Sequence, residues 1–209
     1  MSTVYEPTAW GYMVAHDSDD QTWNGIPPLI SRADFNKATG NRWSTDTDMV
    51  DMVLAAVSQA VRNFCGWHIA PNLPCLYIAY GLEGKIAKLP SMMVTECDVS
   101  TDDGSDFPSG IEWQPRGLVR RDDGCDWPQD WGKYAFEFSS GYESDAMLSQ
   151  IIVQVASNHM AAAPGIREEQ AGAVRLSYNQ MANGVSGGVT LLDREQMLLA
   201  PYRLQLGVV

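Results

Sequence analysis

The stretch Ala60-Val61-Arg62-Asn63-Phe64-Cys65-Gly66-Trp67-His68-Ile69-Ala70-Pro71 marks the end of a helix and the start of an extended segment. Before it, apolar residues recur at helical spacing, which predicts an amphipathic helix over about 48–65. A glycine suits the left-handed conformation that commonly ends a helix, and a proline shortly afterwards prevents the helix from resuming. Four residues are therefore expected to form a structural helix exit: Phe64, Gly66, Trp67 and Pro71.

A shorter helix is predicted upstream of this exit, over residues 31–40. Ser31 and Asp34 have the spacing of a capping box, with Asp in place of the usual Glu or Gln. Phe35 and Ala38 are expected to face inward. Two further helices are predicted downstream, a long one over about 145–163 and a short one over about 192–200.

The sequence pattern between residues 74 and 140 changes to short alternating segments separated by turns. Asp-Gly pairs in this region are typical of hairpin turns, which favours antiparallel pairing. Residues 165–189 are rich in Gly, Ala, Asn and Ser and are expected to form a loop. The predicted strands lie at about 76–80, 85–89, 92–99, 110–113, 118–120 and 134–138.

This order of elements predicts an α+β fold. We expect a small helical domain with two long helices plus short N- and C-terminal helices, an antiparallel β-insert and extended terminal arms. The expected divisions are an N-terminal arm at 1–28, a main domain at 29–200 with its β-insert at about 74–140, and a C-terminal tail at 201–209.

Charge and cysteine content restrict the classes of function. The 209 residues include 14 Lys and Arg against 26 Asp and Glu, a formal net charge of −12. Tight binding of nucleic acid needs cations at the phosphates, and anionic membrane surfaces also attract cations, so both are disfavoured. The N-terminal sequence has neither a basic start nor an apolar signal core, and the four cysteines show no close pairing. We therefore expect a cytosolic protein with free thiols and no membrane association.

No motif for catalysis, for a cofactor or for a metal stands out. Cys65-x-x-His68 with Cys75 lacks the second close ligand pair of a zinc site. The acidic stretch at 98–106 lacks the glycine and the glutamate of a calcium loop. We expect no catalytic residue, no cofactor and no metal, although a small hydrolase or carbohydrate-binding enzyme that uses the clustered acids and tryptophans stays open as an alternative.

Three blocks of sequence resemble the head-to-tail adaptor proteins of tailed bacteriophages, also called head-completion or connector proteins. The first runs from Pro28-Leu29-Ile30-Ser31-Arg32-Ala33-Asp34-Phe35 into the long helix and its Cys-Gly-Trp-His exit. The second is the Gly141-Tyr142 turn before the next long helix, and the third is residues 191–204. The sequence of these blocks is most similar to that of adaptors from phages of actinobacteria.

The resemblance implies a non-enzymatic virion protein at the head-tail neck. Such adaptors form a homo-oligomeric ring, usually a dodecamer, which lies beneath the portal protein and extends the DNA channel. The other face of the ring receives a connector, a stopper or tail proteins. The genome passes through without specific binding, and assembly is expected in the host cytoplasm. A stopper or tail-terminator protein of the same neck is the alternative within this class.

The C-terminal residues carry apolar surface near a chain end, where disorder is normally expected. The resemblance implies that they contact the portal or a neighbouring subunit, and a fold-back onto the chain's own core is the alternative. The residues expected at this contact are Leu198, Leu199, Pro201, Tyr202, Arg203, Leu204 and Leu206.

Overall fold

The computed structural model describes most of the chain, and none of the described helices is both long enough and apolar enough to cross a membrane. The described residues are 3–20, 23–101, 107–128, 133–161 and 189–204, together with the backbone of 168–171 and 174–177.

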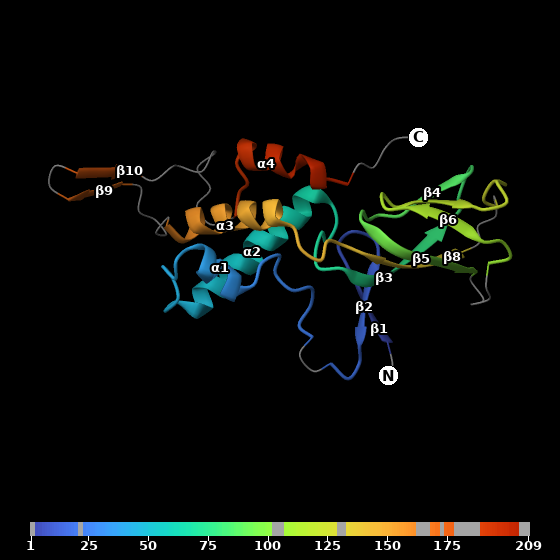
Figure 1. Cartoon of the computed structure of the whole chain (residues 1–209), viewed down its shortest axis with the longest axis horizontal. Coiled ribbons are helices and arrows are strands. Elements are labelled where there is room, and N and C mark those ends of the chain that lie inside the picture. Colours follow the sequence, from blue (N-terminus) through green and yellow to red (C-terminus); the bar gives the residue numbers. More distant parts are fainter. Residues whose placement is uncertain are drawn as a thin grey trace. The chain divides into compact units, whose positions relative to one another are not determined.

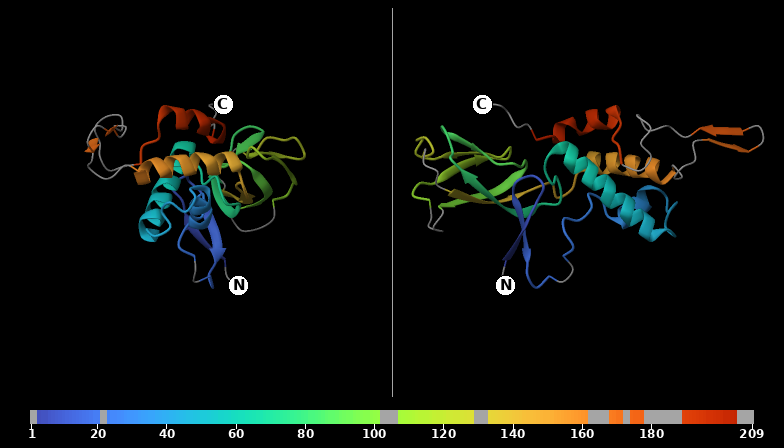
Figure 2. Two further views of the ribbon diagram at one scale, coloured as in Figure 1. Left: turned by 60° about the vertical axis from the view of Figure 1, so that its left-hand side comes forward. Right: turned by 180° about the vertical axis from the view of Figure 1, so that it is seen from behind.

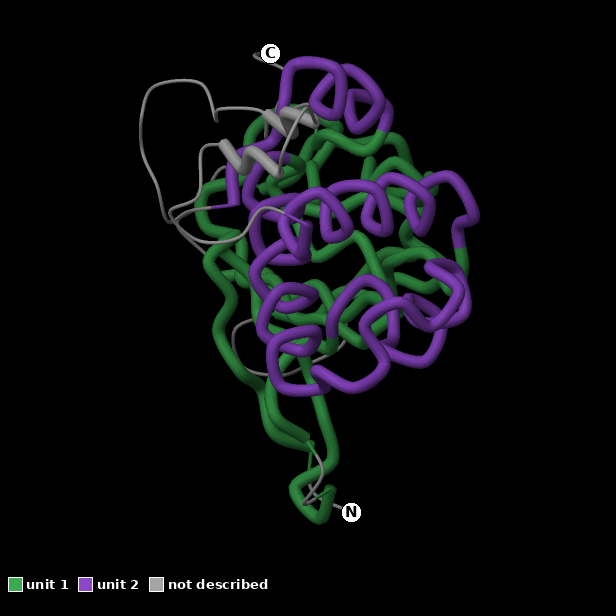
Figure 3. The backbone as a smooth tube through the Cα atoms, turned by 90° about the vertical axis from the view of Figure 1, so that its left-hand side faces the viewer, with its two compact units in different colours: residues 1–27, 65–144, 202–209 green, residues 28–64, 145–201 purple. Residues whose placement is uncertain are grey.

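The chain folds into two compact units, and each unit combines segments that are distant in the sequence (Figure 3). One unit consists mainly of β-strands and the other mainly of helices. The β unit comprises residues 1–27, 65–144 and 202–209, and the helical unit comprises residues 28–64 and 145–201.

The β unit contains a five-stranded antiparallel sheet in the order β1-β2-β3-β8-β5 (Figure 1). β3 and β8 pair along their whole lengths, from Leu73↔Ser140 to Tyr80↔Lys133. β5 pairs with the other edge of β8. The strands are β1 (Thr3–Pro7), β2 (Met13–Asp17), β3 (Leu73–Tyr80), β8 (Lys133–Ser140) and β5 (Val94–Thr101).

A second sheet of three antiparallel strands packs against the first. Its order is β4-β7-β6, with bounds Ile86–Lys88, Leu118–Arg121 and Ile111–Gln114. The core between the sheets is aromatic: Trp127 makes edge-on contacts with Tyr134 and Phe136, with ring centroids 5.8 and 5.6 Å apart. Alternate residues of the strands supply this core because successive side chains point to opposite faces of a sheet.

The expected fold class is therefore wrong, because the β portion is a sheet-rich unit of its own rather than a small insert in a helical domain. Residues 3–7 and 13–17, expected to form an extended arm, pair as the β1–β2 hairpin. That hairpin joins the sheet through Met13↔Leu76 and Val14↔Cys75. Residues 3–7 and 13–17 show little alternation of polar and apolar side chains, and the strand that they join lies far along the chain.

Within its described residues, the helical unit contains four helices, which lie together in both views of Figure 2. The predicted helices are present, with ends close to those expected. The stretch predicted as a loop at 165–189 contains two antiparallel strands within its described backbone, β9 (Glu168–Ala171) and β10 (Val174–Ser177). The helices are α1 (Arg32–Ala38), α2 (Thr47–Cys65), α3 (Ala146–Ala161) and α4 (Asp193–Leu199), which continues as the 3-10 turn η1 (Ala200–Tyr202).

Local sequence signals account for the helix ends. The Ser31 hydroxyl accepts a hydrogen bond from the Asp34 backbone N–H at 3.1 Å and caps α1. Phe35 is fully buried as expected, whereas Ala38 is exposed rather than inward-facing. At α4, a Glu195 carboxylate oxygen accepts from the Leu192 backbone N–H at 2.9 Å. Burial lowers the pKa of His159 on α3, and the nearby Glu195 carboxylate opposes that shift.

Replacing Phe136 with Ala should destabilise the β unit strongly. Phe136 is 0% exposed and lies within the aromatic core. Loss of a buried phenyl ring costs about 3–5 kcal/mol because a cavity remains. Chemical denaturation measures the free energy of unfolding. The matched control is Ile86→Ala, at a side chain that is 53% exposed, which should change it by about 0.5 kcal/mol or less. Equal effects of the two substitutions would contradict this placement of the core.

Candidate functional site

The exit of α2 positions a fully buried tryptophan. α2 ends at Cys65, and Gly66 has φ of +80°, in the left-handed region that a helix end of this kind requires. The turn directs Trp67 into the β unit, where its indole Nε1 donates a 2.7 Å hydrogen bond to the backbone oxygen of Tyr202. The helix exit thus holds a residue 135 positions further along the chain.

A second backbone contact fixes the same C-terminal residues. The Leu204 N–H donates to the Cys65 oxygen at 2.8 Å, which also satisfies a carbonyl at the helix end. The Tyr202 ring lies edge-on against Tyr142, with centroids 5.6 Å apart. We call Cys65, Trp67, Tyr142, Tyr202 and Leu204 the C-terminal anchor.

His68, the next residue, is fully buried in a hydrogen-bonded network. Its Nε2 lies 2.9 Å from the Ser140 oxygen and 3.1 Å from the Pro71 oxygen, so this nitrogen carries a proton and donates. Its Nδ1 lies 2.7 Å from the Tyr12 hydroxyl, which also accepts from the His68 backbone N–H at 3.0 Å. In the neutral ring, Nδ1 therefore accepts the Tyr12 proton. The network fastens β2 and β8 to the helix exit.

Gly141 permits this close packing. A Cβ at this position would lie 2.3 Å from the Pro71 oxygen and 2.9 Å from His68 Nε2. Its φ of +120° is also a conformation that other residues rarely adopt. The neighbouring Ser140 hydroxyl lies 2.8 Å from that of Ser91 and 3.8 Å from the Cys75 sulfur. The interior of the site is thus filled by matched polar groups rather than by an open cavity.

The residues expected at a portal or subunit contact differ in how far their side chains are exposed to solvent. Tyr202 and Leu199 are buried, Leu198 and Leu204 are half-buried, and Pro201 and Arg203 are exposed. Leu206 lies outside the described residues. The described end of the chain thus packs on this chain itself up to Leu204, and a partner has access chiefly to Pro201 and Arg203.

The chemistry available at this site is restricted by burial. Both ring nitrogens of His68 are within hydrogen-bond distance of protein groups, which leaves it a poor zinc ligand. Among the described residues, no group of three or more His, Cys, Asp or Glu side chains could hold a metal ion. The acidic stretch weighed as a calcium loop falls largely on 102–106, outside the described residues. Burial raises the pKa of the Cys65 and Cys75 thiols to about 12, so neither is a reactive thiolate near neutral pH.

An open depression of about 450 Å³ lies beside the network. It contains a single ionisable group, Glu143, and its other side chains include two prolines and a leucine. It therefore offers no nucleophile paired with a base. The lining residues are Pro71, Asn72, Leu73, Pro74, Ser139 and Glu143.

Part of this arrangement could be predicted from the sequence. Gly66, Trp67 and Pro71 stand in a recognisable exit pattern, but the partners Tyr12 and Ser140 carry no local signal. Tyr12 lies 56 residues from His68, and Ser140 lies 72 residues from it. Only the pairing of β2 and β8 on either side of β3 brings them together.

Comparison with known proteins finds likeness at the level of the fold. No family model and no curated protein sequence matches this chain. Among solved structures, it is similar to a chain from the neck of an empty gene transfer agent (GTA) particle, computed with C6 symmetry. That match has a TM-score of 0.54 and 13% identity over 86% of this chain and 92% of the other. A chain from the virion of a native GTA particle matches with a TM-score of 0.50 and 14% identity, over 88% and 95% of the respective chains.

Removing the Tyr12 hydroxyl should destabilise the protein. Tyr12→Phe takes away one partner of His68 Nδ1 and one of its backbone N–H, both buried. A buried polar group that loses its partner costs about 1–3 kcal/mol, which chemical denaturation would detect. The matched control is Tyr80→Phe, at a side chain that is 54% exposed, which should have almost no effect. If the two substitutions were equally harmless, the hydroxyl would not be holding the network.

The cysteines should differ in their reactivity toward a thiol reagent, and the buried thiols should make the free energy of unfolding depend on pH. Cys125 is exposed and should react promptly with a thiol reagent at pH 8, whereas Cys65 and Cys75 should react only after unfolding. Burial raises the pKa of both buried thiols from 9.0 to about 12. Above pH 9 the unfolded chain therefore loses protons that the native chain retains, and stability should fall as pH rises toward 12. Prompt reaction of all thiols in the native protein would contradict this burial.

Proposed function

We propose that this chain is a structural subunit of the neck of a phage-like particle, where it forms an adaptor ring between the portal and the tail or the next connector. The observation that carries the proposal is the likeness in fold to a GTA neck chain over 86% of this chain and 92% of that one. The adaptor-like sequence blocks support the same role independently of the fold.

The proposed assembly is a closed ring, a dodecamer by resemblance to the phage adaptors. A twelve-membered ring contains sixfold symmetry, so this number agrees with the C6 symmetry used for the similar neck. Head-to-tail contacts between identical subunits generate a ring when the rotation closes. The ring would extend the portal channel, and its proposed neighbours are the portal protein on one face and a connector, stopper or tail protein on the other.

The charge distribution supports a channel through which DNA passes without being held. The β unit carries 7 Lys and Arg against 17 Asp and Glu, a formal charge of −10, and the helical unit carries 7 against 9, a charge of −2. Together these account for the total of −12. Phosphates are bound through cations, so an acidic ring offers few contacts to trap the genome. We propose no specific DNA binding, no membrane association and assembly in the host cytoplasm.

The proposed role is non-enzymatic and needs no cofactor. The buried His68 network and the buried thiols serve packing, and no arrangement in the described residues favours the hydrolase or carbohydrate-binding alternative. A stopper or tail-terminator role in the same neck stays as the second candidate. It predicts this chain on the tail side of an adaptor ring rather than directly on the portal.

Imaging of purified particles tests the proposal. An antibody or mass tag on the chain should locate it in a ring that touches the portal, and the reconstruction should show several copies. A ring separated from the portal by another protein would favour the stopper role. Absence from the neck, or one isolated copy, would overturn the proposal.

Truncation should separate folding from docking. We propose that residues beyond Leu204, with exposed Pro201 and Arg203, contact the portal, whereas Tyr202 and Leu204 hold the segment on its own chain. A chain ending at Leu204 should keep the thermal midpoint of the full protein but fail to join filled heads, which gives tailless particles. The matched variant ends at Pro201 and should lose stability, because it removes the Tyr202 and Leu204 contacts. Normal assembly by the chain ending at Leu204 would contradict the docking proposal.

A further inference from the structure

The central strand of the five-stranded sheet is apolar on both faces. β3 reads Leu-Pro-Cys-Leu-Tyr-Ile-Ala-Tyr and carries no charge. A sheet with one face in water normally shows polar residues at alternate positions, whereas a strand covered on both faces reads as a continuous apolar run. Cys75 and Ala79 point into the core, and the alternate residues Leu76 and Ile78 therefore point away from it. The sequence of β3 thus fits a sheet whose outer face is also covered.

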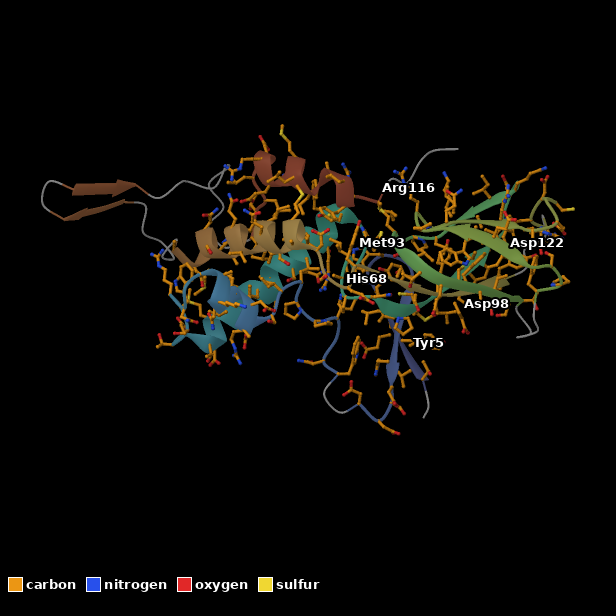
Figure 4. All side chains as sticks on the ribbon, in the orientation of Figure 1. Tyr5, His68, Met93, Asp98, Arg116 and Asp122 are labelled. Carbon is orange, nitrogen blue, oxygen red and sulfur yellow. The ribbon has the colours of Figure 1, made fainter. Side chains whose placement is uncertain are left out.

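The register defines this outer face. Leu76 lies between Met13 of β2 and Glu137 of β8, and Glu137 lies opposite Asp98 of β5. Tyr5 of β1 lies on the same face. Burial raises the pKa of the Tyr5 hydroxyl, and the Glu137 carboxylate raises it further, which indicates that the two groups lie close together. Tyr5 and Asp98 lie on the same side of the sheet in Figure 4.

The outer face is only half covered within this chain. Met13, Leu76 and Ile78 are half-buried, and Tyr5 and Tyr80 are 37% and 54% exposed. None of these five residues belongs to the core cluster of the β unit or packs against it. Exposed carboxylates border the apolar centre along β8 and β5: Glu137, Asp98 and Glu96.

The apolar centre and the carboxylates beside it indicate the chemistry that a partner surface needs. The rim also holds Lys133, opposite Tyr80 at one end of the face, while the three carboxylates lie along β8 and β5. An apolar centre bordered by these carboxylates fits a surface of small apolar groups flanked by cations. The outer side of α1 and the turn that follows it present small apolar residues and cations, together with the exposed Asp34 carboxylate, which accepts a hydrogen bond from the Ser31 hydroxyl. Ala33 and Ala38 are exposed there beside Lys37 and Arg42, and Arg42 stacks on Trp43 with its guanidinium 4.8 Å from the ring centroid. The ion pairs among the described residues include neither Lys37 nor Arg42.

We propose that the outer face of the sheet is an interface for a second copy of this chain, whose α1 region brings Lys37 and Arg42 to the carboxylates. The two surfaces differ, so the contact is head-to-tail and can continue from copy to copy. This contact would cover the exposed Ala38 and the outer apolar face of β3. The inference deepens the proposed ring and rests on that function only for the closure of the ring.

Zero-length cross-linking tests the contact directly. A carbodiimide joins a lysine amine to a carboxylate only when the two groups touch. A mixture of isotope-labelled and unlabelled full-length protein should yield a mixed-isotope peptide pair that links Lys37 to Glu96, Asp98 or Glu137. Only same-isotope pairs would place the contact within one chain and overturn the proposal, and so would the absence of this pair at the highest soluble concentration.

Charge reversal provides the second test. One variant carries Glu96→Lys with Glu137→Lys, and the other carries Lys37→Glu with Arg42→Glu. Each alone should associate about tenfold more weakly or worse in sedimentation, because like charges then meet across the contact. Mixing the two variants should restore association, because every sheet then faces an α1 region of opposite charge.

The controls separate this contact from net charge and from folding. Asp122→Lys with Asp126→Lys makes the same change in net charge, and Asp122 lies apart from Tyr5 and Asp98 in Figure 4, so association should be unchanged. Thermal melting confirms that each variant folds. If the mixture fails to associate while both variants fold, the proposal is wrong. A confirmed contact in a chain absent from the neck would leave self-association standing and remove only the proposed function.

Discussion

The hydrogen bond from Trp67 Nε1 to the Tyr202 oxygen is the contact on which the β unit depends. It forms where α2 ends, so the direction of the chain at Gly66 decides where the indole points. Around it, the Tyr12–His68 contact secures β2 and the contact of His68 with the Ser140 oxygen secures β8. Three segments that are distant in the sequence thus converge on two consecutive residues at the helix exit. A buried network of this kind specifies one arrangement because each unmatched polar group would be costly.

This convergence explains which parts of the fold could be predicted from sequence. The helices were predictable because their signals are local: the apolar period before Phe64, the Ser31 cap and the glycine after Cys65 all lie within one or two helical turns. Five of the six central strands were also predictable because polar and apolar residues alternate between turn residues, and β3 was recognisable as a short uncharged run of apolar and aromatic residues. The β1–β2 hairpin was missed because its residues show little alternation and because it depends on β3, some 60 positions away, for its place in the sheet.

The site shows the same limit. Trp67 and Pro71 could be singled out from the exit pattern, but the identity of what they hold could not. Burial of Tyr202 within the chain follows from an aromatic contact with Tyr142, a hydrogen bond from the Trp67 indole to the Tyr202 oxygen and a backbone hydrogen bond from Leu204 to Cys65. None of these contacts has a sequence signature. Ala38 was misjudged for a related reason. Helical spacing identifies one face, but a seven-residue helix is too short for the spacing to decide where that face ends.

A chain built in this way is consistent with the proposed structural role, in which position matters more than chemistry. The titratable groups at the helix exit are buried and have hydrogen-bond partners within the protein, so they hold the chain in place. The described surface includes a half-covered apolar sheet face with carboxylates and an α1 region that carries Lys37 and Arg42. In a monomer the apolar face would be a liability for aggregation, because it exposes a flat hydrophobic area. In the proposed assembly each copy would cover this face of its neighbour, and the charges would set the direction in which copies follow one another.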